Sequence, residues 1–480
     1  MFAIWSVLLA LFLGAMALAV EHPEFVGPIV LVGHVALAAV FVRAVRSTGD
    51  ILNPLSAIIL LGTIRFTIPW LFVSSGVESR NPIYRLLDLG QLDWQGGELL
   101  ALVGMLAIGL GWLLISDRSL SMGRISFALP AGVQYSALAG MVLGLAFLLL
   151  FLGGNAASIT TVVIEGEFRG TTINEGTGVF FYLALLLPAS SVVLCSFWIA
   201  RGRRLAGLAA VGLSTLAFFM LGGRARAAVA LIAGLLLLWY FRRRGSGKAE
   251  RSSHRSKLAI LVAGAGISLT ILYAGAVYRG SATVPETGAA SAAGLGAYVR
   301  FGILLDIGHL HALAASTAIG PGILHGQALV GPLTFPLTEV LGVPEISSGV
   351  FIVERTIGFP SATSRRWGFD ASLMGDAYLN FGVPGVVVLC GIFGMALKAL
   401  YRRFREGGLH AAVYVLAMIY AIRIVFESIE KWAELLTVVA FAVAVIHASW
   451  LFAVRRSPRQ LSSASSRAPA TIGPPSRLRT

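Results

Sequence analysis

Apolar runs long enough to cross a bilayer follow one another along almost the whole chain. A helix needs about 20 apolar residues to cross the roughly 30 Å of membrane hydrocarbon. The runs therefore predict an all-α, polytopic integral membrane protein with about 12 transmembrane helices, rather than a barrel of short alternating strands. We expect these spans near residues 2–20, 25–44, 54–73, 97–116, 133–153, 179–200, 205–222, 225–241, 258–278, 377–400, 409–427 and 432–453.

One long stretch, residues 279–370, breaks this pattern because it mixes charged, aromatic and proline residues. Long loops of this kind are usually functional. Within it, residues 295–318 can form an amphipathic or re-entrant helix at the outer surface, and proline-rich backbone follows. Irregular backbone at membrane depth must be buried in protein or line a wet cavity. We therefore expect the loop to fold onto a cleft between helices.

The same pattern divides the chain into regions. Residues 1–278 hold about nine of the expected helices, residues 279–370 form the external loop, and residues 371–454 hold about three helices. Residues 455–480, rich in Ser, Arg and Pro, are expected to be a disordered cytoplasmic tail. The first run, residues 2–20, has no basic segment before it and no small-residue cleavage site, so we interpret it as a retained span and not a signal peptide.

Composition excludes a water-soluble globule. Hydrophobic residues make up 57% of the chain, charged residues 12%, and the mean hydropathy is +0.83. Soluble domains carry about twice that charged fraction. Cys195 and Cys390 both lie inside apolar spans, where they are most simply packing residues, so no disulfide framework is indicated.

The formal net charge of +14 is a topology signal. In a soluble protein it would suggest nucleic acid, but here the basic residues cluster on alternate connections between the spans, and the acidic residues favour the other connections. The positive-inside rule then predicts cytoplasmic termini and an external loop 279–370. No nucleic-acid partner is expected. Membrane lipids are expected partners, since the basic connection 242–257 and the tail would be attracted to anionic headgroups.

Several arginines, at membrane depth or near the outer face, are candidate anion ligands. Arg65 lies in the middle of an expected span, where its insertion costs at least about 2.5 kcal/mol, so it marks either a polar site or a buried ion pair. Arg224 and Arg226 follow a Gly-Gly pair at the start of a helix, where glycines allow close approach and the helix dipole is positive. Their guanidinium forks suit a diphosphate. Interfacial anchoring is the alternative.

A further charged face is expected at the end of span 409–427. Arg423 and Glu427 are four residues apart, which places them together on a helix, and this pair serves either function or structure. In the loop, Asp306 and His309 could share a helical face, with His311 on another side. The spacing is not specific for a metal, so we expect no metal and no other cofactor, and keep general acid or base chemistry as an option.

The stretch FDASLMGDAYLNFGVPG at residues 369–385, directly before a late span, resembles the O-antigen polymerases, which join oligosaccharide repeat units in bacterial surface polysaccharide synthesis. The Gly-Gly-Arg at 222–224 and the order of many spans, one large late loop and a few final spans are also similar to that family. The resemblance implies a metal-independent glycosyltransferase of the polytopic, GT-C-like class in the bacterial cytoplasmic membrane.

The resemblance implies undecaprenyl-diphosphate-linked oligosaccharide as the substrate, used at the outer face of that membrane, with a chain-length regulator and a flippase as further partners. A hydroxyl of one repeat unit would attack the anomeric carbon of the growing chain, with arginines in place of a metal. As catalytic candidates we take Asp376, His309 and Glu427. As substrate-binding candidates we take Arg65, Arg224, Arg226, Arg300, Arg355, Arg423, Tyr378 and Asn380.

Asp376 and Asn380 would share a helical face, and Tyr378 would lie on another. Helix capping by Asp376 is the structural alternative to a catalytic role. For the whole protein, one alternative is an O-antigen ligase-like enzyme, which would use the same donor with another acceptor. The other is a transporter or flippase of lipid-linked glycans, in which the arginines would bind substrate without bond formation.

Overall fold

The computed structural model describes residues 10, 12–15, 22–75, 92–116, 132–154, 178–220, 224–242, 308–329, 348–357, 371–407 and 410–456. Every helix and turn discussed below belongs to these ranges. The expected span 258–278, most of the expected span 2–20, the candidates Arg300 and Asp306, the loop parts beyond 308–329 and 348–357, and the tail after residue 456 lie outside the described residues.

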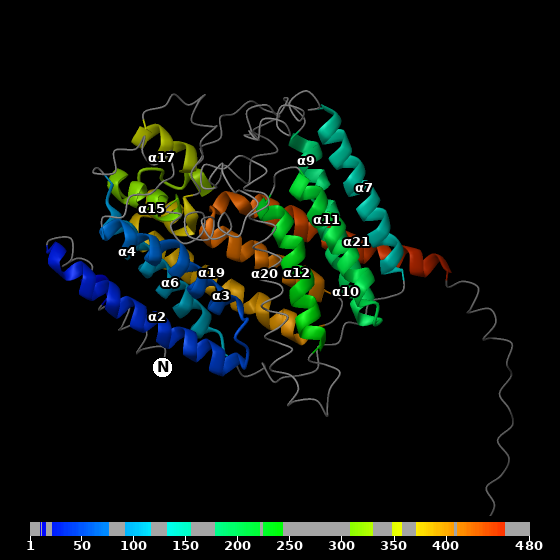
Figure 1. Cartoon of the computed structure of the whole chain (residues 1–480), viewed down its shortest axis with the longest axis horizontal. Helices are drawn as coiled ribbons and strands as arrows, with labels where there is room; N and C mark the ends of the chain where they lie inside the picture. The colour runs from blue at the N-terminus through cyan, green and yellow to red at the C-terminus, as the bar shows by residue number, and fades with distance from the viewer. Residues whose placement is uncertain are drawn as a thin grey trace, which may run out of the picture.

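The described part of the chain is built from helices (Figure 1). They are η1 (Pro23–Phe25), α2 (Val26–Thr48), α3 (Pro54–Gly62), the π-helix η2 (Thr63–Thr67), α4 (Ile68–Ser74), α6 (Trp94–Leu114), α7 (Val133–Gly154), α9 (Gly178–Ala184), α10 (Leu186–Ala200), α11 (Arg204–Met220), α12 (Arg224–Arg242), α15 (Gly308–Ile319), α17 (Ser348–Ile357), α19 (Ser372–Glu406), α20 (Ala411–Phe426), η5 (Ile429–Lys431) and α21 (Trp432–Arg456).

The described residues contain 7 helical segments long and apolar enough to cross a membrane. They are Val26–Thr48, Pro54–Ser74, Trp94–Leu114, Val133–Gly153, Val179–Ala200, Ser372–Glu406 and Trp432–Ser449. Shorter apolar helices are Arg204–Phe218, Ala228–Tyr240 and Ala411–Phe426. All of these coincide with expected spans, so a polytopic helical membrane architecture is confirmed, while the full number of 12 spans stays a prediction.

The arrangement has two flanks joined by the last helices (Figure 1). Helices α2, α3, α4 and α6 lie on one flank together with α15 and α17, and helices α7 to α12 form the other. Helix α19 packs against α6, α21 packs against α7 and α10, and α20 contacts both α3 and α12. The C-terminal helices are therefore the structural link between the two halves of the chain.

The contact between α6 and α19 is made by glycines. A Cβ on Gly111 would lie 1.9 Å from the carbonyl oxygen of Gly391, and a Cβ on Gly394 would lie 2.0 Å from that of Ile108. Only glycine permits two backbones to come so close, which is the usual way for membrane helices to gain packing contacts. Among the long apolar helices that the structure describes, α6 is accordingly the most buried, with 83% of its apolar stretch inside the protein.

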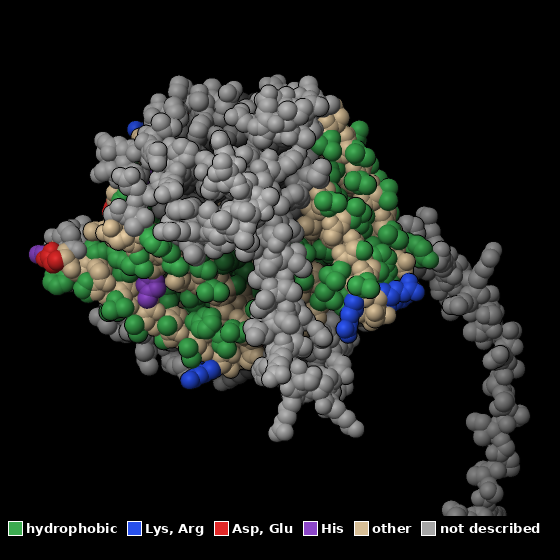
Figure 2. Space-filling model, in the orientation of Figure 1, with side chains coloured by type: hydrophobic (Ala, Val, Ile, Leu, Met, Phe, Trp, Pro, Cys, Tyr) green, Lys and Arg blue, Asp and Glu red, His purple; other side chains and the backbone are tan. Residues whose placement is uncertain are grey.

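The outer surface of the bundle is apolar. Hydrophobic side chains cover most of the described surface on the face seen in Figure 2. On α2, Leu31, Val32 and Val35 are more than half exposed. Exposed large apolar side chains in such number fit a surface in contact with lipid rather than water.

Two helical interruptions fall near candidate residues. The span 54–74 contains the π-helical turn η2, which carries Arg65, and such turns are frequent at functional sites. Helix α19 is interrupted at Gly382, whose φ of 68° lies in the left-handed region, just before Pro384. Proline cannot continue the hydrogen-bond ladder and glycine alone takes this φ without strain, so the two residues together set the bend.

The described loop helix α15 is not amphipathic. Leu310, His311 and the residues up to Ala315 are fully buried, because α15 lies against α6 and α19. A Cβ on Gly97 of α6 would meet the backbone nitrogen of Ala314 at 2.8 Å, so this helix-to-helix contact is also made at a glycine. The amphipathic interpretation is therefore not supported for residues 308–319, and the re-entrant alternative stays a prediction.

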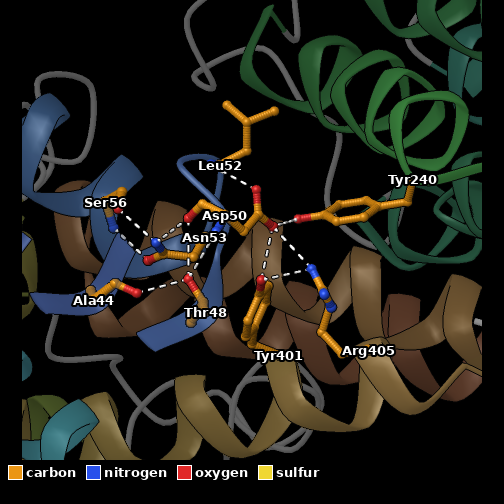
Figure 3. A network of polar contacts seen from close by, with 9 residues as sticks. All are labelled: Ala44, Thr48, Asp50, Leu52, Asn53, Ser56, Tyr240, Tyr401 and Arg405. Carbon is orange, nitrogen blue, oxygen red and sulfur yellow. Dashed lines mark hydrogen bonds and ion pairs between the residues drawn. The ribbon is translucent and has the colours of Figure 1, made fainter. Parts of the chain in front are cut away.

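Asp50 is the centre of a network of polar contacts between three segments of the chain (Figure 3). The buried carboxylate, just after α2, accepts hydrogen bonds from the hydroxyl of Tyr240 on α12 and, at 2.8 Å, from that of Tyr401 on α19. Arg405 lies 3.5 Å from the same oxygen, and the backbone N–H of Leu52 donates to the other at 3.1 Å. A charge so fully hydrogen-bonded can be buried, so Asp50 ties three distant segments together. We call this set of contacts the Asp50 clamp.

Candidate functional site

At the end of α19 far from the Asp50 clamp, the segment that carries the sequence motif is hydrogen-bonded to the large loop and to the turn after α20. The N–H of Gly322 donates to the carbonyl of Tyr378 at 3.0 Å, and that of Leu324 donates to the carbonyl of Leu379 at 2.9 Å. The N–H of Ser372 donates to the carbonyl of Glu427 at 3.0 Å. We call this region, residues 321–326, 371–382 and 426–434, the α19 junction.

Asp376 is the centre of the α19 junction. Its side chain is fully buried, and its Oδ2 accepts from the Ser428 hydroxyl at 3.0 Å and from the Ile429 N–H at 2.6 Å. The Asn380 side-chain amide donates to the carbonyl of Asp376 at 2.7 Å, so the two residues do share one side of the helix, as predicted.

The expected capping role of Asp376 needs a correction. Helix α19 begins at Ser372, so Asp376 lies inside the helix and does not cap it. Instead its carboxylate accepts a hydrogen bond from the backbone N–H of Ile429, the first residue of η5, where the chain turns from α20 into α21. Helix starts leave N–H groups without partners in the helix, and a carboxylate supplied by another element satisfies one of them.

Arg423 forms the ion pair that the i, i+4 spacing predicts. Its Nε donates to Oε1 of Glu427 at 2.8 Å and its Nη2 donates to Oε2 at 2.5 Å, while Nη1 lies 3.3 Å from Oε2 of Glu434. The guanidinium also lies 5.2 Å from the centre of the Tyr420 ring. The pair is bidentate and mostly buried, and its positive charge is compensated by two carboxylates. This geometry favours the structural interpretation of Arg423.

The loop helix α15 presents two different histidines. His311 is fully buried with its ring centre 5.9 Å from that of Trp94, and burial lowers the pKa of His311 to about 4. It is therefore neutral at ordinary pH. His309 is only half-buried, so of the two it is the one with a partly exposed side chain. Its predicted neighbour Asp306 lies outside the described residues.

Arg65 lies beside the end of α20. It is half-buried in η2, and the next residue, Phe66, stacks on Phe426 with ring centres 5.9 Å apart. Because Phe426 ends α20 and belongs to the α19 junction, the π-helical turn borders that junction. On α17, which packs on α15, Arg355 is exposed and its guanidinium lies 5.5 Å from the ring of Phe351. Tyr378 is half-buried.

Arg224 and Arg226 do begin a helix, as predicted, since they form the first turn of α12. Their side chains and the preceding glycines lie outside the described residues, as does Arg300. The diphosphate site assigned to these arginines stays a prediction. Among the described residues no group of three or more His, Cys, Asp or Glu side chains could hold a metal ion. Metal independence also stays a prediction.

The sequence pattern does not predict the buried polar cluster around Glu98. Glu98 of α6 is fully buried, and its Oε1 accepts from the hydroxyl of Thr67 at 2.9 Å. That hydroxyl lies 2.8 Å from Nε2 of His34 on α2. The only signal for this cluster was a glutamate at the edge of an apolar run, which the span boundary near residue 97 placed at a helix end.

Comparison with known proteins adds no relative. No protein-family model, no curated protein and no solved structure matches this chain.

Proposed function

We propose that this protein is a polysaccharide polymerase that joins undecaprenyl-diphosphate-linked oligosaccharide repeat units at the outer face of the bacterial cytoplasmic membrane. The observation that carries the proposal is the α19 junction. The motif segment 369–385, on which the family resemblance rests, is described from residue 371 onward, and there it is hydrogen-bonded both to the large loop and to the turn after Arg423. Three parts of the sequence proposed to act together are thus neighbours in space.

In the proposed reaction a sugar hydroxyl of one repeat unit attacks the anomeric carbon of the growing chain. The new carbon–oxygen bond forms as the bond from that carbon to the diphosphate oxygen breaks, and lipid diphosphate leaves with the bonding electron pair. The hydroxyl proton passes to a general base. His309 suits this role better than the other candidates, because Asp376 is fully buried and Glu427 is held by Arg423.

The negative charge that develops on the diphosphate needs cationic donors. Arg65 and Arg355 are the described candidates with an exposed or half-buried side chain, and Arg224, Arg226 and Arg300 complete the proposed set. Arg423 is assigned to positioning, since its guanidinium is already bound to carboxylates. The backbone carbonyl of Tyr378 holds the start of α19 against the loop, and the side chain of Asn380 bonds within α19 to the carbonyl of Asp376, so both residues are assigned to the acceptor side of the site.

The alternatives use the same residues differently. A ligase-like enzyme would make one transfer to a different acceptor, and a flippase would move the donor without breaking a bond. The test is to incubate the purified, lipid-reconstituted protein with a defined lipid-diphosphate oligosaccharide and to separate the products by length. A ladder with a step of one repeat unit is expected. Absence of any product longer than the substrate would contradict the proposal.

A matched pair of variants tests the assigned base. His309→Gln should lower product formation by about 100-fold or more, the usual contribution of a general base, while donor binding persists. His447→Gln is the control, because His447 is exposed on α21 and lies by His410, just before the start of α20, whereas the α19 junction follows the end of α20. Equal loss in both variants, or wild-type activity in His309→Gln, would remove His309 from the mechanism.

A further inference from the structure

Three separate membrane spans bring His34, Thr67 and Glu98 into one hydrogen-bonded line. His34 belongs to α2, Thr67 to the π-helical turn η2 and Glu98 to α6. The Thr67 hydroxyl lies 2.8 Å from Nε2 of His34 and 2.9 Å from Oε1 of Glu98. Glu98 is fully buried, whereas 23% of the His34 side chain is exposed. The line therefore runs from the surface of the bundle to its interior.

The hydrogen-bond pattern fixes where protons can be. Nδ1 of His34 lies 2.8 Å from the carbonyl oxygen of Val30, and a carbonyl only accepts, so Nδ1 carries a hydrogen. Thr67 has a single hydroxyl hydrogen, so it can donate to His34 or to Glu98 but not to both. The group that does not receive it must donate to the hydroxyl oxygen.

When His34 and Glu98 share one exchangeable proton, two arrangements satisfy this rule. In the first, Glu98 is a neutral acid that donates to Thr67, and Thr67 donates to the neutral ring of His34. In the second, the imidazolium of His34 donates to Thr67, and Thr67 donates to the carboxylate of Glu98. The distance of 4.0 Å between Nε2 of His34 and Oε1 of Glu98 is short enough for the charged arrangement to be a true ion pair.

We propose that His34, Thr67 and Glu98 form a proton relay, which binds one exchangeable proton and moves it between the buried carboxyl of Glu98 and the half-buried ring of His34. When the proton moves from Glu98 toward His34, the O–H bond of Glu98 breaks and its proton joins the Thr67 oxygen. The original hydroxyl proton of Thr67 passes to Nε2 of His34. The products are a carboxylate, an intact hydroxyl and an imidazolium, so protons and charge balance.

A purely structural role explains the cluster less well. Oε2 of Glu98 is buried and has no hydrogen-bond partner among the described residues. A structural carboxylate is normally satisfied at both oxygens, because an ionised group in an apolar interior is costly. The neutral acid leaves no buried charge, and the Thr67 hydroxyl connects its proton to the partly exposed ring of His34. Thr67 lies in a π-helical turn, a feature that is common at functional sites.

Other ionisable groups lie on the elements around this cluster, so an activity profile against pH could not isolate Glu98. Near this end of α6 they are Asp93 before α6, Arg65 on η2, His309 and His311 on α15, and Asp376 on α19. At the far ends of the packed helices they are Arg43, Arg46, Lys398, Arg402, Arg403, Arg405 and Glu406. The readout must therefore belong to Glu98 itself.

Infrared difference spectroscopy gives such a readout. The full-length protein in lipid nanodiscs should show a carbonyl stretch of a buried, protonated carboxylic acid, and this band should be absent from Glu98→Gln, which keeps the size of the side chain. If no acid band depends on Glu98 at any pH at which the protein is folded, the relay is refuted.

The path is tested by the rate at which this band shifts in heavy water. Thr67→Ser keeps the hydroxyl and should exchange as the wild type does. Thr67→Val removes it and should exchange about tenfold more slowly, the factor expected for one lost hydrogen bond. Both variants keep Glu98, so the band itself confirms that each is folded around the site. Exchange in Thr67→Val at the wild-type rate would overturn the proposal.

Discussion

Asp376 and Ile429 lie 53 positions apart, yet the side-chain Oδ2 of Asp376 accepts the backbone N–H of Ile429 at 2.6 Å. This bond fastens the start of α19 to the turn between α20 and α21. The bond also changes the role assigned to Asp376, which the sequence analysis takes as a catalytic candidate. A fully buried acceptor, with the Ser428 hydroxyl as its second donor, positions the chain rather than the substrate.

Replacement of Asp376 should therefore lower the free energy of unfolding and affect the reaction only indirectly. Asp376→Ala leaves the Ile429 N–H and the Ser428 hydroxyl without their acceptor, which should lower the free energy of unfolding by about 1–3 kcal/mol. Asp376→Asn keeps one acceptor oxygen and should lose less. Chemical unfolding of both variants in the same detergent measures the difference. An Asp376→Ala protein as stable as the wild type, but inactive, would instead favour a direct catalytic role.

Arg423 and Glu427 should show a large coupling free energy in protein stability. Arg423→Gln leaves Glu427 and Glu434 buried without their cation, and breaking a buried pair in this way costs about 3–5 kcal/mol. Arg423→Lys keeps the charge but loses the bidentate fork, so it should restore part of the loss. A double-mutant cycle with Glu427→Gln measures the coupling. Additive losses in the cycle would show that the pair contributes little.

Gly111 should not tolerate a side chain. In Gly111→Ala the new Cβ would lie 1.9 Å from the carbonyl oxygen of Gly391, so α6 and α19 must separate. Overpacking of this kind costs roughly 1–3 kcal/mol. Gly153→Ala is the matched control, since nothing lies within 4 Å of the new Cβ there. The thermal midpoint should fall in the first variant and stay or rise in the second, and the opposite order would contradict the packing of α6 on α19.

The Asp50 clamp should depend on its carboxylate more than on either tyrosine. Tyr240→Phe removes one of several donors and should cost about 1 kcal/mol, the net worth of a typical hydrogen bond. Asp50→Ala removes the common acceptor of Tyr240, Tyr401 and Arg405 and should cost more than the single tyrosine variant. Limited proteolysis and unfolding midpoints report both effects. Equal stability of the two variants would mean that the clamp is not centred on Asp50.

Local patterns in the sequence predicted the helices well. Apolar run length located the described spans, because the bilayer sets one length for every helix that crosses it. Helical spacing also predicted the Arg423–Glu427 pair and the shared side of Asp376 and Asn380, since residues four apart on a helix are neighbours. Each of these predictions depends on the sequence of a single helix and on no contact between helices.

Contacts between helices could not be predicted in the same way. Tyr240 is 190 positions from Asp50, and the line from His34 to Glu98 crosses three spans, so no spacing rule relates their residues. The burial of α15 also depends on a partner, because Gly97 of α6 makes room for its backbone. The acceptor role of Asp376 toward η5 is tertiary for the same reason.

We propose that this protein forms glycosidic bonds with release of lipid diphosphate. The most direct measurement is the amount of free undecaprenyl diphosphate released by the purified protein from a defined lipid-linked repeat unit, counted against the glycosidic bonds formed. We expect one lipid diphosphate to be released for each bond, in products that grow by whole repeat units. Binding or translocation of the donor with no release of lipid diphosphate would contradict it and favour a transporter.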